Sequence, residues 1–346
     1  MTEFFEKNHV LNGDFEYIKN NFDWSPFSGK TVLITGASGF LGSLVTKSIL
    51  FSTKNTKILA LVRNSEKTRR VFENFCTERL KFIVQDVCEP LKTAEKADFI
   101  IHAASETSSD KFFNKPVQTI ETMFNGTQNL LKYAVKSGAE GFVYISSLEI
   151  YGAHADDEKI GENSFCTLDT MNPRSSYPES KRICENLCAA YAKEHGLRAM
   201  SARLTQTFGA GMDYDDDRVI MQFVRSVIER KNIVLHTDGA SKKKYCYAAD
   251  AVLAILTILT KGEPAQAYNI AGDGTYFSIK ELAQKLIAKY PETKLIFEKT
   301  GSEKYFPACS MNLDTQKLEN LGFRSKFSID GMLERTIRYF EEENEH

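Results

Sequence analysis

The stretch Thr31-Val-Leu-Ile-Thr-Gly-Ala-Ser-Gly-Phe-Leu-Gly42 joins a short apolar run to an apolar helical pattern through three glycines. The run at 31–35 predicts a buried strand, and the pattern at 41–51 predicts a helix. Glycines between them let the backbone turn tightly and approach a pyrophosphate, which the N–H groups at the start of a helix attract. The stretch therefore predicts a dinucleotide-binding loop made by Gly36, Ser38, Gly39, Phe40, Leu41 and Gly42.

Strands alternate with helices from this loop to about residue 209. Further strands are predicted at 57–62, 81–85, 98–103, 142–146 and 198–204, and helices at 116–136 and 178–195. Such alternation is typical of a parallel sheet covered by helices on both faces. We therefore predict an α/β protein with a doubly wound parallel sheet.

The sequences on either side of this region show a different pattern of predicted elements. Residues 1–28 are predicted to form an N-terminal cap on the dinucleotide-binding domain at 29–209, and 152–176 a polar loop near a site. Shorter elements after residue 209 predict a smaller α/β C-terminal lobe, 210–346, that binds substrate and is interleaved with the first domain. These are helices near 217–230, 249–260 and 278–289, and strands at 232–236 and 266–270.

Composition excludes several functional classes. The chain has 346 residues, 44 Lys and Arg against 46 Asp and Glu, and a net charge of −2, which argues against a nucleic-acid partner. Seven cysteines without a CxxC pair predict free thiols and no metal site. The N-terminus lacks an apolar signal region, and the apolar stretch 248–260 is too short to span a bilayer. We expect a cytoplasmic protein that does not associate with membranes.

The end of the second strand bears on the cofactor. A carboxylate there would bond the ribose hydroxyls of NAD, whereas a cation suits the 2′-phosphate of NADP. The sequence reads Leu61-Val62-Arg63-Asn64, with no carboxylate and with Lys67, Arg69 and Arg70 close behind. Arg63 therefore favours NADP, with NAD possible; a solvated basic start of a helix is the alternative.

A phenol and an ammonium group lie one helical turn apart in Tyr177-Pro-Glu-Ser-Lys181. A nearby Lys⁺ lowers the pKa of a tyrosine, whose ordinary value is about 10. The phenolate of Tyr177 can then take a proton from a substrate hydroxyl while hydride leaves the same carbon for nicotinamide. Both residues are thus predicted to be catalytic and to contact the cofactor.

These motifs together resemble the extended short-chain dehydrogenases/reductases, the NAD(P)-dependent nucleotide-sugar epimerase/dehydratase family. The GxxGxxG loop, Asp86-Val87, the stretch Asp98-Phe-Ile-Ile-His-Ala-Ala104 and Tyr177-x-x-x-Lys181 carry the resemblance, which covers about 30–340. It implies a Rossmann-type fold and a homodimer formed by the helices near 112–136 and 178–195. It also implies cofactor contacts at Asp86, Val87, Ala103 and Ala104, and substrate contacts at Ser105, Ser147, Glu149, Gln206 and Lys243.

The segment Tyr144-Ile-Ser-Ser-Leu-Glu-Ile-Tyr-Gly152 resembles the family's catalytic-serine stretch. The resemblance makes Ser147 a hydrogen-bond donor to the reacting oxygen, with Ser146 as the near alternative. A carboxylate such as Glu149 beside a 4-keto sugar can remove the acidified proton at C5, although a surface carboxylate without a role is the alternative. Leu148 stands where 4,6-dehydratases carry an acid, whereas decarboxylases carry Thr-Ser-Glu, which matches at Glu149.

Three departures from the family pattern concern the substrate. Gln206 replaces the usual asparagine, Lys243 stands where an arginine normally reaches the diphosphate, and Met123 takes the place of an asparagine. Lysine keeps the charge at a phosphate but loses the bidentate fork. The sugar or nucleotide is therefore expected to differ from those of the familiar branches.

Three functions fit these patterns. The first is an enzyme that oxidises a nucleotide-diphosphate sugar at C4 with a retained NAD(P) and then epimerises, dehydrates or decarboxylates the keto intermediate. The second is an NADPH-dependent nucleotide-sugar reductase that releases its cofactor. The third, a non-catalytic dinucleotide-binding sensor, is disfavoured by the intact set of Ser147, Tyr177 and Lys181.

Overall fold

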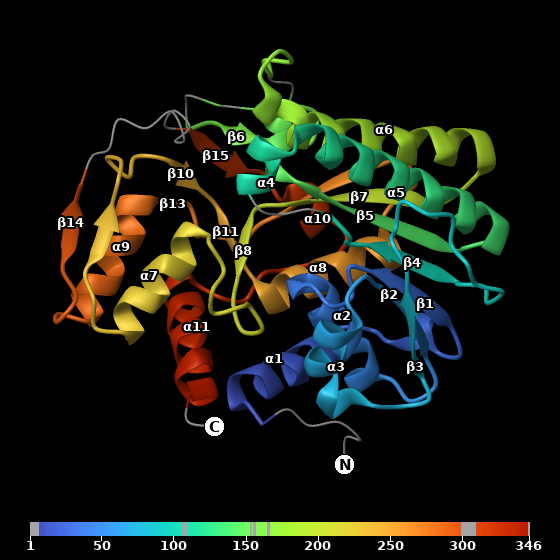
Figure 1. The fold of residues 1–346 in the computed structure, drawn as a ribbon, viewed down its shortest axis with the longest axis horizontal. Helices are drawn as coiled ribbons and strands as arrows, with labels where there is room; N and C mark the ends of the chain where they lie inside the picture. Colours follow the sequence, from blue (N-terminus) through green and yellow to red (C-terminus); the bar gives the residue numbers. More distant parts are fainter. Residues whose placement is uncertain are drawn as a thin grey trace.

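The computed structural model describes residues 7–105, 109–152, 154, 157–164, 167–298 and 309–344. Within them the main sheet has seven strands in the order β12-β7-β5-β4-β1-β2-β3, all parallel (Figure 1). This confirms the predicted α/β fold with its parallel sheet. The strands are β1 Thr31–Thr35, β2 Lys57–Val62, β3 Leu80–Val84, β4 Phe99–His102, β5 Gly141–Ser147, β7 Ala199–Leu204 and β12 Ala267–Ile270.

Helices cover both faces of this sheet. On one face, α2 Phe40–Ser52 and α8 Ala248–Lys261 pack into the larger core, and on the other α5 Pro116–Ser137 and α6 Ser176–His195 pack side by side (Figure 1). Helix α5 starts on a proline, and both α5 and α6 end on a glycine in the left-handed conformation. These residues at the helix ends, together with the apolar strands, account for the layers of helices on the sheet.

The strand order reverses at β1, because β2 and β3 continue to one side and β4, β5 and β7 to the other. In doubly wound sheets ligands bind at such a switch point, outside the carboxyl ends of the strands. The glycine loop after β1 and the serine pair that ends β5 both lie at this edge.

The other described strands are short and form smaller sheets. One sheet has the order β13-β10-β15-β6 and two further pairs are β11-β8 and β14-β9. The elements outside the main sheet include β6 Lys159–Ile160, β8 Gln206–Phe208, α7 Val219–Ile228, β9 Ile233–Leu235, β10 Lys242–Lys243, β11 Tyr245–Tyr247, β13 Phe277–Ser278, α9 Ile279–Lys289, β14 Leu295–Phe297, β15 Ser310–Leu313 and α10 Gln316–Glu319. The segment 152–176 was expected to be a loop throughout, but it contributes β6, which pairs with β15. The strand predicted at 266–270 corresponds to β12, at the edge of the main sheet, and the helix predicted at 249–260 corresponds to α8, which packs on that sheet.

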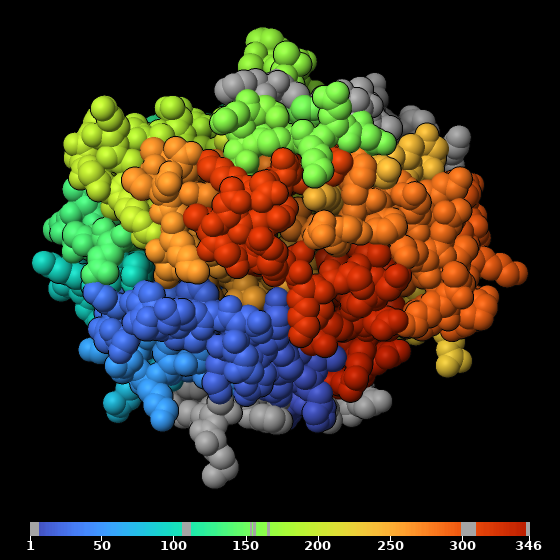
Figure 2. All heavy atoms as spheres, turned by 180° about the vertical axis from the view of Figure 1, so that it is seen from behind, coloured from blue at the N-terminus to red at the C-terminus, as the bar shows by residue number. Residues whose placement is uncertain are grey.

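The N-terminal helix α1, His9–Asn20, packs on α2, α8 and the C-terminal helix α11, Ile329–Asn344. Figure 2 shows this N-terminal segment lying against the C-terminal helix on the back of the molecule. Asp14 joins the two ends, because it accepts hydrogen bonds from Tyr247 Oη at 2.8 Å and Arg335 Nη2 at 2.5 Å. The remaining helices are α3 Ser65–Val71 and α4 Ser109–Asn114, with 3-10 turns η1 Ser25–Phe27, η2 Glu73–Phe75, η3 Leu148–Tyr151 and η4 Pro173–Ser175.

Candidate active site

The glycine loop is folded tightly on itself. Gly36 has a φ of +64°, and its carbonyl accepts a hydrogen bond from the Gly39 N–H at 2.9 Å. A Cβ on Gly36 would lie 2.9 Å from the Ala103 carbonyl, and one on Gly42 would lie 2.2 Å from the Gly36 oxygen. Gly39 precedes α2 and provides no side-chain cap, so the N–H groups of Phe40, Leu41 and Gly42 are available at the positive end of the helix. This backbone suits a pyrophosphate.

A buried chain of hydrogen bonds runs from β1, before the glycine loop, to α6. Thr35 Oγ1 lies 2.8 Å from His102 Nδ1, and His102 Nε2 lies 3.1 Å from Thr127 Oγ1, which donates to Cys184 Sγ at 3.3 Å. Thr127 donates its only hydroxyl hydrogen to the sulfur, so its oxygen can only accept from His102. His102 therefore donates from Nε2 and accepts from Thr35 at Nδ1. Burial, and then the charge of Lys181, lowers the pKa of His102 to about 3, so the ring is neutral.

This chain also holds the backbone beside the glycine loop. Thr35 Oγ1 accepts a hydrogen bond from the Ala104 N–H at 3.1 Å. Ala103, Ala104 and Ser105 follow β4 and are half-buried at the carboxyl edge of the sheet. The predicted cofactor contacts at 103 and 104 are therefore fixed against Gly36.

The residues predicted to contact the adenosine half follow β2 and β3. Arg63 is exposed directly after β2, and Asn64 caps α3 by accepting a hydrogen bond from the Lys67 N–H. Asp86 is exposed after β3, with Oδ1 accepting from the Cys88 N–H at 2.8 Å. Val87 is buried against Gly126, where a Cβ would approach within 2.9 Å.

Tyr177 and Lys181 lie in the first part of α6 and are both buried, while Ser147 ends β5 beside them. Lys181 Nζ donates to the Ile145 carbonyl at 2.7 Å and lies 5.6 Å from the centre of the Tyr177 ring. Burial lowers the pKa of Lys181 to about 8. The structure thus brings together the three residues that the sequence singled out.

The electrostatics of Tyr177 differ from the sequence expectation. Burial, followed by the charge of Glu149, holds the pKa of the phenol well above its ordinary value. Among the groups that lower this pKa are a hydrogen bond with Ser147 and the charges of Arg174 and Arg218.

Glu149 lies in η3, two residues beyond Ser147, whose Oγ accepts a hydrogen bond from the Glu149 N–H at 3.2 Å. Its carboxylate contacts Arg174, with Nη2 at 3.0 Å from Oε1 and 2.9 Å from Oε2. The preceding Leu148 is buried in a small apolar cluster with Ile150. A carboxylate that can serve as a base is therefore present beside Ser147, and an acid at position 148 is not.

The predicted substrate residues lie on different elements. Gln206 begins β8 and Lys243 lies in β10; both are half-buried. Met123 is buried in α5, and its carbonyl accepts a hydrogen bond from the Cys184 thiol at 3.4 Å. Position 123 therefore supports α6 from within the core.

Sequence reasoning missed three side chains at the site. Phe112 of α4 stacks on Tyr177 with ring centres 4.2 Å apart, and Arg174 lies over both rings. Arg218 lies over the Phe40 ring at 5.6 Å and donates from Nη1 to the Thr207 carbonyl at 2.9 Å. No motif in the sequence pointed to these three side chains.

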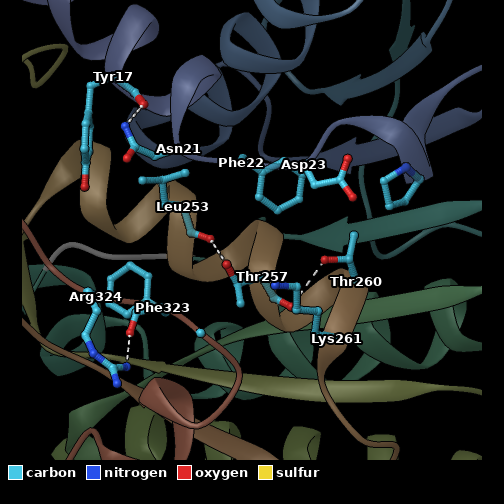
Figure 3. Close-up of a pocket in the computed structure, with 12 residues that line it drawn as sticks. Tyr17, Asn21, Phe22, Asp23, Leu253, Thr257, Thr260, Lys261, Phe323 and Arg324 are labelled. Carbon is cyan, nitrogen blue, oxygen red and sulfur yellow. Dashed lines mark hydrogen bonds between the residues drawn. The ribbon is translucent and has the colours of Figure 1, made fainter.

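A separate cavity of about 250 Å³ lies between the end of α1, α8 and the loop at 322–324 (Figure 3). Its lining includes Lys261, which ends α8. That end of α8 lies beside the amino ends of β5 and β7, because Arg198 donates to the carbonyls of Leu259 and Gly262. The cavity is thus at the edge of the sheet opposite Ser147 and plays no part in the site described above.

The chain belongs to the NAD dependent epimerase/dehydratase family, whose model matches residues 32–271. The matched region contains the glycine loop, Ser147, Tyr177 and Lys181. The protein is therefore an enzyme of this NAD-dependent class.

Relatives within the family carry out different reactions. The chain is 28% identical to the dTDP-D-glucose 4,6-dehydratase of Mus musculus, over 90% of this chain and 88% of that protein. It is 27% identical to UDP-glucuronic acid decarboxylase 1 of Danio rerio, over 92% and 74%. Dehydratases and decarboxylases are thus about equally similar to it.

Solved structures share the fold. A UDP-glucose 4-epimerase from Thermotoga maritima with UDP-glucose superposes with a TM-score of 0.80 at 20% identity, over 91% of this chain and 99% of that one. A dTDP-glucose 4,6-dehydratase from Streptomyces venezuelae with NAD bound gives 0.77 at 24% identity, over 91% and 98%.

Two further features concern metals and membranes. Within the part of the chain that the structure describes, no group of three or more His, Cys, Asp or Glu side chains could hold a metal ion. Among the same residues, no helix has both the length and the apolarity needed to cross a bilayer.

Proposed function

We propose that this enzyme oxidises a nucleotide-diphosphate sugar at C4 with a retained dinucleotide and then epimerises, dehydrates or decarboxylates the 4-keto intermediate. The observation that carries the proposal is the position of Glu149 beside Ser147 and Tyr177, at the carboxyl edge of the sheet. A simple oxidation needs only the serine, tyrosine and lysine, whereas removal of the proton at C5 needs a further base.

The side chains have distinct parts in this reaction. Ser147 donates a hydrogen bond to the oxygen at C4, and Tyr177 takes the proton of that hydroxyl. A bound dinucleotide supplies the hydride acceptor at its nicotinamide ring. Lys181, held by the Ile145 carbonyl, adds positive charge close to the phenol ring.

The second step is limited by the residue before Glu149. Elimination of a hydroxyl group needs a proton donor, and the Leu148 side chain is apolar and buried. Epimerisation and decarboxylation do not require an acid at this position. Leu148 therefore favours these two outcomes over the usual form of dehydration.

We also propose that the enzyme accepts NADP. Arg63 is exposed at the carboxyl end of β2, where no carboxylate is available for the ribose hydroxyls of NAD. The same observation supports the second candidate, an NADPH-dependent reductase that releases its cofactor.

The decisive experiment has two parts. Denaturing purified protein and identifying what is released separates the candidates: stoichiometric dinucleotide is expected for the first, and an empty site indicates the reductase. Incubation with UDP-glucose, UDP-glucuronate and dTDP-glucose, followed by mass analysis and by C5 deuterium exchange in D₂O, identifies the second step. Tyr177→Phe should abolish turnover of any accepted sugar; retained turnover would refute the catalytic assignment.

The homodimer is likewise a proposal, by analogy with the fold. Exposed apolar side chains on α5 and α6 support it, namely Val117, Ile120, Val135 and Ile183. Light scattering on a sizing column would give the mass. The cytoplasmic location stays a prediction from the sequence.

A further inference from the structure

The turn before α6 presents an arginine to the carboxylate beside the catalytic serine. Arg174 lies in η4 and contacts both oxygens of Glu149, at 3.0 and 2.9 Å. The two side chains are 14% and 33% exposed, so the pair is largely withdrawn from water. The turn is itself fixed, because Asn172 accepts from the Arg174 N–H at 3.0 Å and Ser175 Oγ donates to the Asp169 carbonyl at 2.6 Å.

The same guanidinium group covers the aromatic rings at the site. Its central carbon lies 5.1 Å from the centre of the Phe112 ring and 6.0 Å from that of Tyr177. A guanidinium over an aromatic face is attracted by the ring quadrupole, most strongly where water is excluded. Arg174 therefore contacts the carboxylate and the phenol ring at once.

This arrangement has an electrostatic consequence for Tyr177. Among the described residues, the charged and titratable groups that face the phenol include Glu149 from η3, Arg174 from η4, Arg218 ahead of α7, Tyr144 of β5 and Lys181 of α6 itself. A carboxylate beside a phenol opposes formation of the phenolate, because two negative charges would then lie close together. An arginine on that carboxylate opposes this effect.

We propose that Arg174 is a positioning residue for the reaction assigned above, on which this inference rests. It holds Glu149 in one orientation beside the sugar and offsets the charge of that carboxylate at the Tyr177 phenol. A purely structural arginine would only tether the turn before α6. The two roles differ in one respect: only the first makes the effect of removing Arg174 depend on the charge of Glu149.

The test uses the holoenzyme and whichever of the three panel sugars is turned over. Single-turnover reduction of the bound nicotinamide, followed by absorbance, reports oxidation at C4 before any chemistry at C5. Below the pKa of Tyr177, which lies well above its ordinary value, the rate of this step follows the fraction of phenolate. Arg174→Gln should raise that pKa by about one unit, which slows the step about tenfold.

The double variant is decisive. Glu149→Gln alone should lower the pKa of Tyr177 and speed the step, and Arg174→Gln combined with Glu149→Gln should return the rate to the wild-type value or above it. Arg174→Lys keeps the charge and should stay close to wild type. Arg338→Gln is the matched control, because Arg338 also pairs with a glutamate but is exposed on α11.

A loss of rate in Arg174→Gln that Glu149→Gln does not relieve would overturn the proposal. Thermal unfolding identifies any variant that does not fold. If Arg174→Gln fails to fold, the faster step in Glu149→Gln still has to be observed. Failure of the proposed function is read separately, as turnover that survives Tyr177→Phe.

Discussion

Replacing Gly42 by alanine tests the geometry of the glycine loop. A Cβ at this position would lie 2.2 Å from the Gly36 oxygen and 2.8 Å from the Gly36 carbonyl carbon, and both of these atoms belong to the backbone. A backbone group cannot swing away as a long side chain can. The first turn of α2 must therefore shift relative to the loop that Gly36 begins.

The expected magnitude follows from what that shift disturbs. Overpacking costs about 1–3 kcal/mol, and alanine recovers up to about 1 kcal/mol through its better helix propensity, so the loss of stability should be modest. Dinucleotide binding should weaken more than stability, because the N–H groups at the start of α2 would no longer point at the pyrophosphate. Losing one hydrogen bond to a charged group costs about 1.5–3 kcal/mol, which corresponds to roughly 10- to 150-fold weaker dinucleotide binding.

Isothermal titration with NAD and NADP measures this loss, and urea unfolding measures stability. The control is Gly138→Ala at the end of α5, where φ is +69° and an added Cβ would meet nothing within 4 Å. That variant should lose about 1–2 kcal/mol of stability and keep its affinity. If Gly42→Ala binds dinucleotide within twofold of the wild type, the tight loop is not what presents the pyrophosphate site.

Two further predictions concern the cofactor and the chain termini. Arg63→Glu should lower the ratio of NADP to NAD affinity by at least about tenfold, because it replaces a contact to a charged phosphate by repulsion. The control is Lys57→Glu, since Lys57 is exposed at the other end of β2. An unchanged ratio of affinities in titrations of Arg63→Glu would contradict the NADP proposal. Burial raises the pKa of Asp14 from 3.8 to about 6, so the folded state holds this proton more tightly than the unfolded state. Protonated Asp14 therefore adds roughly 3 kcal/mol to the free energy of unfolding, and this contribution is lost as pH rises from about 4 through 6. Urea unfolding of wild type and Asp14→Asn between pH 5 and 7.5 should show the wild type losing stability relative to the variant, and parallel pH dependences would refute this.

The main sheet was largely predictable because its strands bury nearly every side chain. β1 and β2 have almost continuous buried positions, and their apolar runs predicted their bounds correctly. β3 is an edge strand whose residues are all exposed or half-buried, and its prediction was displaced by one residue. β6 and β10 have two residues each, which is too short for any periodicity, so the small sheet that contains them was not foreseen.

The amino-acid order alone identified the glycine loop and the Tyr177–Lys181 pair, because both depend on neighbours within one turn of backbone. The tertiary structure decided the electrostatic surroundings of those groups. Arg174 reaches Glu149 across 25 positions of the chain, and Thr35 reaches His102 across 67. Charge interactions and burial depend on distance in space, and here that distance is fixed by how β1, β4, β5 and α6 pack. The pKa of Tyr177 and the neutral state of His102 therefore follow from the fold.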